Sequence, residues 1–388
     1  MQSIESKVIR QRIAKTKENE HSSPIFMTSS FEYDSAEDMQ LAFSEGDTNI
    51  YSRYTNPNFK EFIDRLCIYE NAEAGHATAS GMSAVFSSFM TFLQAGDHLL
   101  SCSSIFGSTY GLINNWLPKY GMETTFLDVN QVDSWESAVK QNTKMLYIET
   151  PTNPGLGIID IQQVANWCKA KNILLVVDNC FATPYLQQPL NLGADLSIHS
   201  ATKFIDGQGR GVGGAVLGRK DLIEEIIQFC RTTGPALSPF NAWMFSKSLE
   251  TLAVRMDRHC ESAERIAKYL EGRSGIKKVV YPFLESHPQY HIAKKQMKKG
   301  GALVAFELEG GLDQGQRFLN ALEMCSLTAN LGDTKTIVSH PASTTHSRMT
   351  EEDRLAVGIS NSFIRISAGL ENVEDILTDI DKGLSILK

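Results

Sequence analysis

The chain has 388 residues, of which 42% are hydrophobic and 21% charged, and its 37 basic and 45 acidic residues give a net charge of −8. This composition excludes a disordered chain, a collagen and a pure coiled coil, and it is typical of a soluble globular protein with two or three domains of ~150 residues. The lack of a basic stripe argues against nucleic acid as a partner.

The cysteines and the N-terminus indicate the compartment. An odd number of cysteines without a C-x-x-C pair predicts reduced, buried thiols, which are typical of the cytoplasm. The cysteines are Cys67, Cys102, Cys168, Cys180, Cys230, Cys260 and Cys325. The first residues are charged and lack the apolar stretch of a signal peptide, and no apolar run approaches the ~18 residues of a membrane span. We therefore expect a cytoplasmic protein that neither crosses a membrane nor is exported by a standard signal.

Residues 1–57 show no sustained hydrophobic period and are rich in Ser, Thr, Asn and aromatic residues. They predict an ordered but irregular N-terminal arm, which is not a domain and needs a surface on which to lie. From Asn58 the pattern changes, because apolar residues at 59, 62, 63, 66 and 69 follow the i, i+3, i+4 spacing of one helix face.

The next part of the chain alternates short apolar runs with helical stretches. The runs are 99–102, 124–127, 145–148, 173–177 and 196–198, and the helical stretches include 83–93 and 161–169. This alternation predicts an α/β fold with a mostly parallel sheet that is covered by helices on both faces. Because ligands of such sheets bind at the carboxyl ends of the strands, we look for chemistry just after each run.

A Gly-rich segment at 207–218 is followed by a helical region from about 239 to 272, which we expect to link two halves of the chain. Beyond it, strand-like runs alternate with helices, and the segment 371–384 has a helical pattern. We therefore expect a large domain at 58–250 and a smaller C-terminal α/β domain at 251–388.

Residues that suit one cofactor stand at the ends of two predicted strands. Asp178 follows the run 173–177, and Lys203 follows the run 196–198, with Ser200 and Thr202 beside it. Pyridoxal phosphate needs a lysine for its Schiff base, an anion at its pyridine nitrogen and donors for its phosphate. The pattern therefore predicts a pyridoxal phosphate site. The alternative is a surface ion pair with hydroxyls that cap helices.

Two further segments could complete a phosphate site. Residues 80–84 open a predicted helix, whose N–H groups would bind a phosphate, and Gly81 would allow a close approach. In the segment 51–57, Arg53 could bind a phosphate as a fork and Tyr51 could donate a hydroxyl. The alternatives are simple helix capping for the first segment and a surface loop for the second.

These segments and several others resemble the motifs of the Cys/Met-metabolism family of pyridoxal phosphate enzymes, and the resemblance extends from about residue 24 to the C-terminus. The motifs that carry the resemblance are SPIFMTSSF (23–31), YSRYTNP (51–57), SGMSA (80–84), ETPTNP (149–154), DNCFATP (178–184), SATKF (200–204), VGGAV (212–216), SHPASTTH (339–346) and IRISAGLE (364–371). The resemblance implies a fold of the type I aminotransferase class.

The resemblance also implies a role for each motif residue in holding the cofactor. Lys203 would form the Schiff base and then carry protons, and Asp178 would pair with the pyridine nitrogen. The phosphate would be held by Ser200, Thr202, Gly81 and Met82, together with Tyr51 and Arg53 of a neighbouring subunit. The minimal active unit would then be a dimer, and the resemblance implies a homotetramer built as a dimer of dimers with shared sites.

The remaining motif residues would face the substrate and the cofactor ring. Asn153 would touch the phenolic oxygen of the cofactor and, with Asn330, the substrate. Arg365 would hold the substrate carboxylate as a bidentate fork. Phe106, in the segment FGST (106–109), stands where most lyases of the family have a tyrosine that stacks on the ring. Phenylalanine keeps the stacking area but has no hydroxyl that could give or take a proton.

Three departures from the common family pattern narrow the activity. They are Phe106, the segment NLGDTK (330–335) and Lys247, and together they resemble the O-succinylhomoserine sulfhydrylases. This implies that O-succinyl-L-homoserine, or O-acetyl-L-homoserine, reacts with sulfide to give L-homocysteine in methionine biosynthesis. The alternatives are cystathionine γ-synthase, methionine or cystathionine γ-lyase, and a non-catalytic relative, which would be free to lose the lysine that this chain retains.

Metal binding is not expected. The nine histidines are scattered, and His340 and His346 have no cysteine or carboxylate beside them at ligand spacing. Both histidines are predicted to lie in the core or to support the site from behind.

Overall fold

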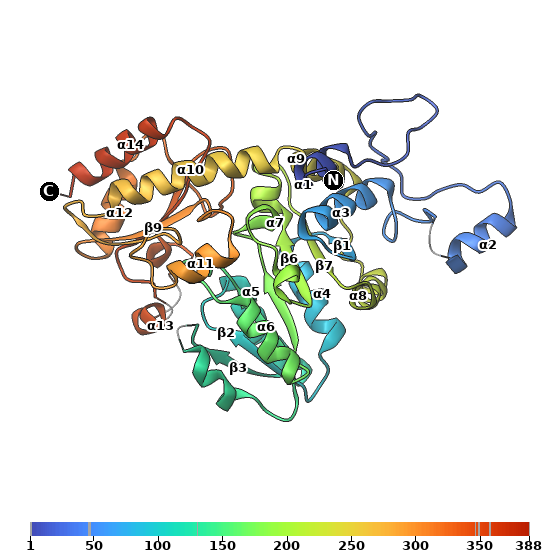
Figure 1. Ribbon diagram of the computed structural model, residues 1–388, viewed down its shortest axis with the longest axis horizontal. Coiled ribbons are helices and arrows are strands. Elements are labelled where there is room, and N and C mark those ends of the chain that lie inside the picture. Colours follow the sequence, from blue (N-terminus) through green and yellow to red (C-terminus); the bar gives the residue numbers. More distant parts are fainter. Residues whose placement is uncertain are drawn as a thin grey trace.

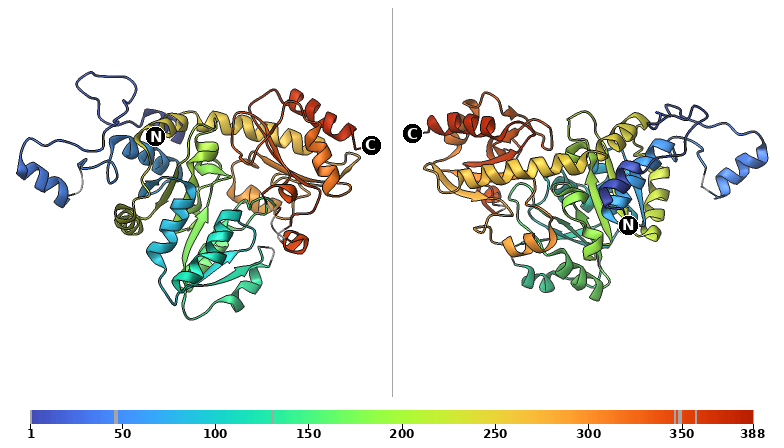
Figure 2. Two further views of the ribbon diagram at one scale, coloured as in Figure 1. Left: turned by 180° about the vertical axis from the view of Figure 1, so that it is seen from behind. Right: turned by 45° about the horizontal axis from the view of Figure 1, so that its top comes forward.

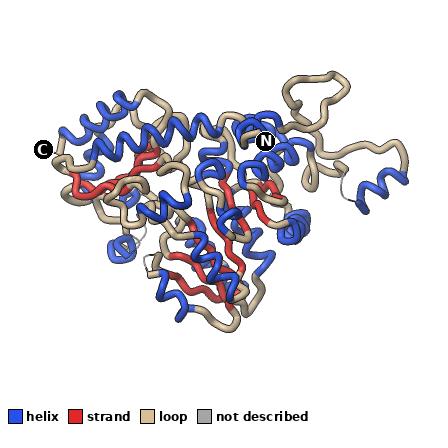
Figure 3. Tube along the Cα trace, viewed as in Figure 1, coloured by secondary structure: helices blue, strands red, loops and turns tan. Residues whose placement is uncertain are grey.

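The protein, described here by a computed structural model, contains two β-sheets joined by a long helix (Figures 1 and 3). The structure describes residues 2–45, 48–129, 131–345, 347, 350–356 and 358–387. The helices are α1 (Ile4–Arg10), α2 (Ala36–Glu45), α3 (Pro57–Glu70), α4 (Gly81–Phe92), α5 (Gly107–Asn115), α6 (Ile161–Ala170), α7 (Thr183–Leu186), α8 (Lys220–Thr233), α9 (Pro239–Leu249), α10 (Leu252–Leu270), α11 (Tyr290–Gln296), α12 (Leu312–Asn320), α13 (Glu351–Ala356) and α14 (Val373–Ser385).

The larger sheet has seven strands in the order β1-β7-β6-β5-β4-β2-β3. Its strands are β1 (Ala74–Thr78), β2 (His98–Cys102), β3 (Glu123–Leu127), β4 (Thr143–Glu149), β5 (Leu174–Asp178), β6 (Leu196–Ser200) and β7 (Gly214–Gly218). Only β7 runs antiparallel to its neighbours, β1 and β6. The prediction of a mostly parallel α/β sheet is therefore confirmed.

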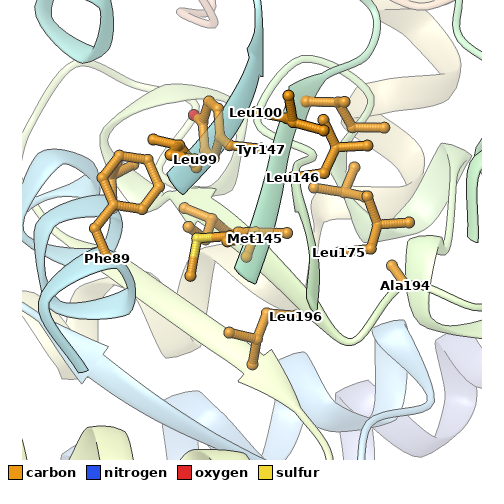
Figure 4. Close-up of a cluster of buried hydrophobic side chains, with 14 of the residues drawn as sticks. Phe89, Leu99, Leu100, Met145, Leu146, Tyr147, Leu175, Ala194 and Leu196 are labelled. Carbon is orange, nitrogen blue, oxygen red and sulfur yellow. The ribbon is translucent and has the colours of Figure 1, made fainter. Parts of the chain in front are cut away.

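Helices cover both faces of this sheet. Successive side chains of β7 pack alternately into two apolar cores, one on each face. Val216 packs into one core together with residues of α4 and α8, whereas its neighbours Ala215 and Leu217 pack into a second core together with α3 and α9. Figure 4 shows the first core around the central strands, where Leu100, Leu146 and other apolar side chains meet. A strand that is buried on both faces must be apolar at successive positions, which explains the apolar runs in the sequence.

The N-terminal arm is more regular than its sequence suggests. The helix α1 packs on α3 through Val8, which has no exposed surface. The first residues of the arm are therefore held against the rest of their own chain. The helix α2 instead extends away from the body (Figures 1 and 2). Its Met39, Leu41 and Phe43 are 47%, 52% and 58% exposed. The described residues therefore leave about half of the surface of these apolar side chains exposed.

The predicted helical region at 239–272 is two helices, α9 and α10, which are separated at Glu250 and Thr251. The guanidinium of Arg255 stabilises this junction, because it donates to the carbonyl oxygen of Ser248 at the end of α9. The same group also donates to the carbonyl oxygens of Phe204 and Ile205. The junction is thus tied to the turn that follows β6.

The C-terminal part contains the smaller sheet, with five strands in the order β10-β11-β12-β9-β8. These strands are β8 (Ile276–Val280), β9 (Leu303–Leu308), β10 (Ser326–Leu327), β11 (Ile337–Ser339) and β12 (Phe363–Ser367). The helices α10, α12 and α14 pack together against this sheet and share one apolar core with it. The predicted C-terminal helix at 371–384 corresponds to α14. Among the described residues, no helix combines the length and the hydropathy that crossing a membrane requires.

Candidate active site

Asp178 and Lys203 emerge at the same edge of the larger sheet. Asp178 is the last residue of β5, which pairs in parallel with β6. Lys203 lies in a π-helical turn, Ala201–Ile205, directly after β6, and its backbone leaves helical geometry at φ −92° and ψ −130°. Cys180 contacts both segments, because its backbone N–H donates to Asp178 and its Sγ lies 3.9 Å from the carbonyl oxygen of Ser200 at the end of β6. The predicted juxtaposition therefore exists.

Each carboxylate oxygen of Asp178 accepts one hydrogen bond. The backbone N–H of Cys180 donates to Oδ1 at 3.0 Å, and the hydroxyl of Tyr147 donates to Oδ2 at 3.0 Å. Burial raises the pKa of Asp178, and these two donors oppose that shift because they stabilise the charged form. The two donors also fix the plane of the carboxylate.

The amine of Lys203 is partly buried and, among the described residues, forms a hydrogen bond with Asn330. Its Nζ donates to Oδ1 of Asn330 at 2.5 Å, although the two residues are far apart in sequence. Burial lowers the pKa of Lys203, and the positive charge of Arg365 lowers it further. An amine in this setting is neutral at a lower pH than a free lysine, which suits a nucleophile or a base.

The N-terminus of α4 and the end of β6 form a tight cradle. A capping box between Ser80 and Ser83 satisfies the N–H groups of these two residues, which leaves Gly81 and Met82 to supply the outward N–H groups of the first turn. A Cβ atom on Gly81 would lie 2.7 Å from Cβ of Ser200, so only glycine fits there. This cradle has the donors and the space that a phosphate group needs.

Thr202 stands next to this cradle. Its hydroxyl accepts the N–H of Gly213 at 3.2 Å and contacts the carbonyl oxygen of Gly213 at 3.4 Å. The turn that carries Lys203 is thereby joined to the segment before β7. The Ser200 and Thr202 hydroxyls lie on the same short segment as Lys203, as predicted.

Arg365, on β12 of the smaller sheet, is 7% exposed and lacks a full set of partners. Its Nη1 donates to Oδ1 of Asn153 at 2.8 Å and its Nη2 contacts the carbonyl oxygen of Asn330 at 3.5 Å. Its buried Nε has no hydrogen-bond partner among the described residues. Burial lowers the pKa of Arg365 to about 10, and the charge of Glu149 opposes this shift. A buried guanidinium with an unused N–H fits an anionic ligand such as a carboxylate.

Phe106 precedes α5 and presents an aromatic ring that is 41% exposed. Its backbone N–H donates to Oε2 of Glu149 at 2.7 Å, which holds this segment against the end of β4. An exposed ring at this position, next to the end of β4, is available for stacking on a planar ligand.

Sequence reasoning missed Tyr147 and Glu149, which lie on β4 beside Asp178. Glu149 is 3% exposed, and burial together with the nearby charge of Asp178 raises its pKa well above the ordinary value. Glu149 and Asp178 are register partners at the ends of adjacent strands. The sequence did contain a sign of Glu149, because this residue directly follows an apolar run, just as Asp178 does.

Tyr51 and Arg53 do not join the lysine site within one chain. Arg53 donates to the carbonyl oxygen of Arg231 and to the hydroxyl of Tyr54, and its guanidinium lies 4.6 Å from the centre of the Tyr54 ring. Tyr51 is 41% exposed. In the described part of the chain, no hydrogen bond or ion pair connects either residue with Lys203 or with the cradle at Gly81.

His340 is buried and bonded at both ring nitrogens, to the Ser343 hydroxyl and to the carbonyl oxygen of Asn361, each at 2.8 Å. This is a supporting position, and His346 lies outside the described residues. Among the residues that the structure describes, no group of three His, Cys, Asp or Glu side chains could hold a metal ion.

These groups fit pyridoxal phosphate. The amine at Lys203, the carboxylate at Asp178 and the glycine cradle at α4 match its aldehyde, its ring nitrogen and its phosphate. The orphaned N–H of Arg365 adds a place for a carboxylate.

Comparison with known proteins agrees with this fit. Residues 5–385 match the family described as Cys/Met metabolism PLP-dependent enzyme. An O-succinylhomoserine sulfhydrylase of Pseudomonas aeruginosa is 47% identical over 98% of this chain and 94% of the relative. An L-methionine γ-lyase of Fusobacterium nucleatum is 43% identical over 93% of this chain and 92% of the relative. A Campylobacter jejuni structure with N'-pyridoxyl-lysine-5'-monophosphate has a TM-score of 0.94 and 32% identity, covering 98% of this chain and 99% of that chain.

Proposed function

The chain belongs to the pyridoxal phosphate-dependent enzymes of Cys/Met metabolism, and on this premise we propose that it catalyses a γ-replacement. In this reaction O-succinyl-L-homoserine, or O-acetyl-L-homoserine, exchanges its acyloxy group for sulfide and yields L-homocysteine, as in methionine biosynthesis. The observation that carries the choice within the family is the phenylalanine at 106, together with 47% identity to a sulfhydrylase.

The residues of the lysine site would hold the cofactor as follows. Asp178 would pair with the ring nitrogen, Phe106 would stack on the ring, and Asn153 would contact the phenolic oxygen. The phosphate would be bound by the N–H groups of Gly81 and Met82 and by the hydroxyls of Ser200 and Thr202. When bound, the cofactor supplies an electron sink for the carbon that carries the substrate amine.

Lys203 would move the protons of the reaction. With substrate in the site, Nζ of Lys203 would remove the proton from the substrate α-carbon and would return protons to the carbon atoms further along the substrate. Asn330 accepts a hydrogen bond from this amine in the present structure, so we propose that it holds the amine and contacts the substrate. Arg365 would bind the substrate α-carboxylate and thereby set the distance between the α-carbon and Lys203.

The side chain of Phe106 favours an ester as the substrate. A carboxylate leaves the γ-carbon without much help from an acid, whereas a thiolate is a poorer leaving group. Because Phe106 has no hydroxyl, it cannot donate a proton to the leaving group. An acylated homoserine is therefore a better substrate for this site than methionine.

A second candidate function is methionine γ-lyase, which the 43% identity to the F. nucleatum enzyme favours. A steady-state panel of succinyl, acetyl and phosphoryl homoserine, each with sulfide or cysteine, and of L-methionine alone separates the candidates. We expect the highest kcat/KM for O-succinyl-L-homoserine with sulfide. The matched variant Phe106→Tyr restores a hydroxyl and should raise elimination from L-methionine. Faster turnover of cysteine than of sulfide would instead indicate cystathionine γ-synthase.

We also propose that residues 1–57 form an arm that lies on a neighbouring subunit, that 58–250 form the cofactor domain and that 251–388 form the C-terminal domain. The arm would bring Tyr51 and Arg53 to the phosphate of that subunit within a homotetramer of two dimers. The apolar side chains of α2 support this proposal, because the described part of their own chain leaves about half of their surface exposed. The free state of all seven cysteines supports a cytoplasmic location.

Arg53→Ala is expected to weaken cofactor binding by roughly tenfold or more, the usual cost of losing a charged hydrogen bond, while the melting temperature of the apoprotein changes little. Cofactor titration and thermal melts measure the two effects, and Arg219→Ala, at an exposed arginine, is the control. A fully active monomer after deletion of residues 1–57 would contradict the shared site.

A further inference from the structure

Tyr147 places a hydroxyl at the back of the candidate cofactor site. The residue lies on β4 with no exposed surface, and its ring packs edge-on against Phe89 at 5.3 Å between ring centres. Figure 4 shows the ring among apolar side chains of the first core, with its oxygen at one end. A buried hydroxyl is costly unless it has partners. Here it donates to Oδ2 of Asp178 at 3.0 Å, and the side chain of Thr109 also forms a hydrogen bond with it.

The packing alone does not require this hydroxyl. A phenylalanine would fill the same volume between Phe89 and the central strands, without a polar atom to satisfy. A hydroxyl has one proton to donate, and here that proton goes to the carboxylate of Asp178 on the neighbouring strand. With Oδ1 held by the N–H of Cys180 and Oδ2 held by Tyr147, the carboxylate has no freedom to rotate.

We propose that Tyr147 is a positioning residue, which keeps Asp178 oriented toward the ring nitrogen of pyridoxal phosphate and keeps it ionised. This inference rests on the proposed function, because it takes the pairing of Asp178 with the cofactor as given. The proposal gives β4 an indirect part in cofactor binding, through the hydrogen bond from Tyr147 to Asp178.

Charged and titratable groups surround Asp178, and together with burial they decide whether its carboxyl group is ionised. Glu149 faces it from β4, His199 lies on β6, and Lys203 and Cys180 lie just beyond the strand ends. Burial raises the pKa of Asp178, while the hydrogen bonds from Cys180 and Tyr147 and the charge of His199 lower it. Tyr147 itself stays protonated, because burial and the neighbouring carboxylates raise its pKa well above the ordinary value. It is thus a donor at every working pH.

The variant Tyr147→Phe tests the proposal, because it removes the hydroxyl and keeps the ring. Titration of the apoprotein with pyridoxal phosphate, followed by visible absorbance, should show roughly tenfold to hundredfold weaker binding, as expected for a lost bond to a charged group. Asp178 is ionised above its pKa, and loss of the donor raises that pKa. The acid limb of cofactor binding should therefore move to higher pH.

The matched control is Tyr281→Phe. Tyr281 is equally buried in the core of the C-terminal part, and its hydroxyl donates to the carbonyl oxygen of Gly301 at 3.1 Å. This variant should lose some stability but keep the cofactor affinity and its pH profile. Melting temperatures of both apoproteins establish that the two substitutions are comparable.

A double-mutant cycle with Asp178→Asn separates this inference from the proposed function. Unchanged cofactor affinity in Asp178→Asn would contradict the proposed role of Asp178 itself. If Asp178→Asn binds weakly, Tyr147→Phe should add little to it. The inference is overturned if Tyr147→Phe binds like the wild type at every pH, if its effect is the same in the Asp178→Asn background, or if only Tyr147→Phe fails to fold.

Discussion

Lys203→Ala is expected to lower the rate of homocysteine formation by at least ~1,000-fold, because it removes the group that would move the α-proton. In the wild type, burial lowers the pKa of Lys203. The acid limb of the pH profile of kcat should therefore lie below the ordinary lysine value of about 10.4. Steady-state assays of replacement with sulfide measure the first effect, and a pH profile of the wild type measures the second.

Chemical labelling provides an independent readout for Lys203. Borohydride reduction of the wild-type protein should fix the cofactor on the peptide that contains Lys203, and mass spectrometry should find no such peptide in Lys203→Ala. Lys220→Ala, at an exposed lysine that forms a long ion pair with Glu224 at 3.8 Å, is the control and should behave like the wild type. Labelling of another lysine, or turnover near the control level, would contradict the assignment.

Arg365→Met is expected to lower kcat/KM for the acylated homoserine by roughly 100-fold or more, because it removes the partner of a buried substrate carboxylate. Arg365→Lys keeps a positive charge but loses the fork and the contact of Nη1 with Asn153, so it should recover only part of the loss. Steady-state kinetics of both variants with sulfide in excess give these values.

A substrate analogue without the α-carboxylate tests the cause of that loss. The wild type should use the decarboxylated ester poorly, and Arg365→Met should use it about as poorly as the wild type does, since neither can form the contact. A further large loss with this analogue would show that Arg365 acts through the fold and not through the carboxylate.

The strand pattern and the chemistry after each strand were readable from the sequence. A strand that is buried on both faces needs an uninterrupted apolar run, so the runs at 145–148 and 173–177 predicted β4 and β5 correctly. Residues that follow such runs must emerge at one edge of a parallel sheet. This rule predicts from the sequence that Asp178 and Lys203 lie at the same edge.

Contacts between distant segments were not readable in the same way. The bond between Lys203 and Asn330 and the bond between Arg365 and Asn153 each join the two parts of the chain. Neither periodicity nor spacing limits which loops meet across more than a hundred residues. Arg365 was expected only through family resemblance, and its unpartnered Nε became visible only in the folded chain.

Tyr147 shows most clearly which features the sequence determines and which depend on the tertiary structure. Within the run 145–148 it is an apolar residue of a buried strand, and its hydroxyl carries no pattern. The sequence by itself determined a mildly acidic α/β protein with an aspartate and a lysine at neighbouring strand ends. Local periodicity identifies the strands, and parallel strands end at the same edge of their sheet. Only the tertiary structure decided that β4 supports Asp178 from behind and that the C-terminal sheet brings Arg365 to the same site. These outcomes depend on how sheets and loops pack, and packing is a property of the whole chain.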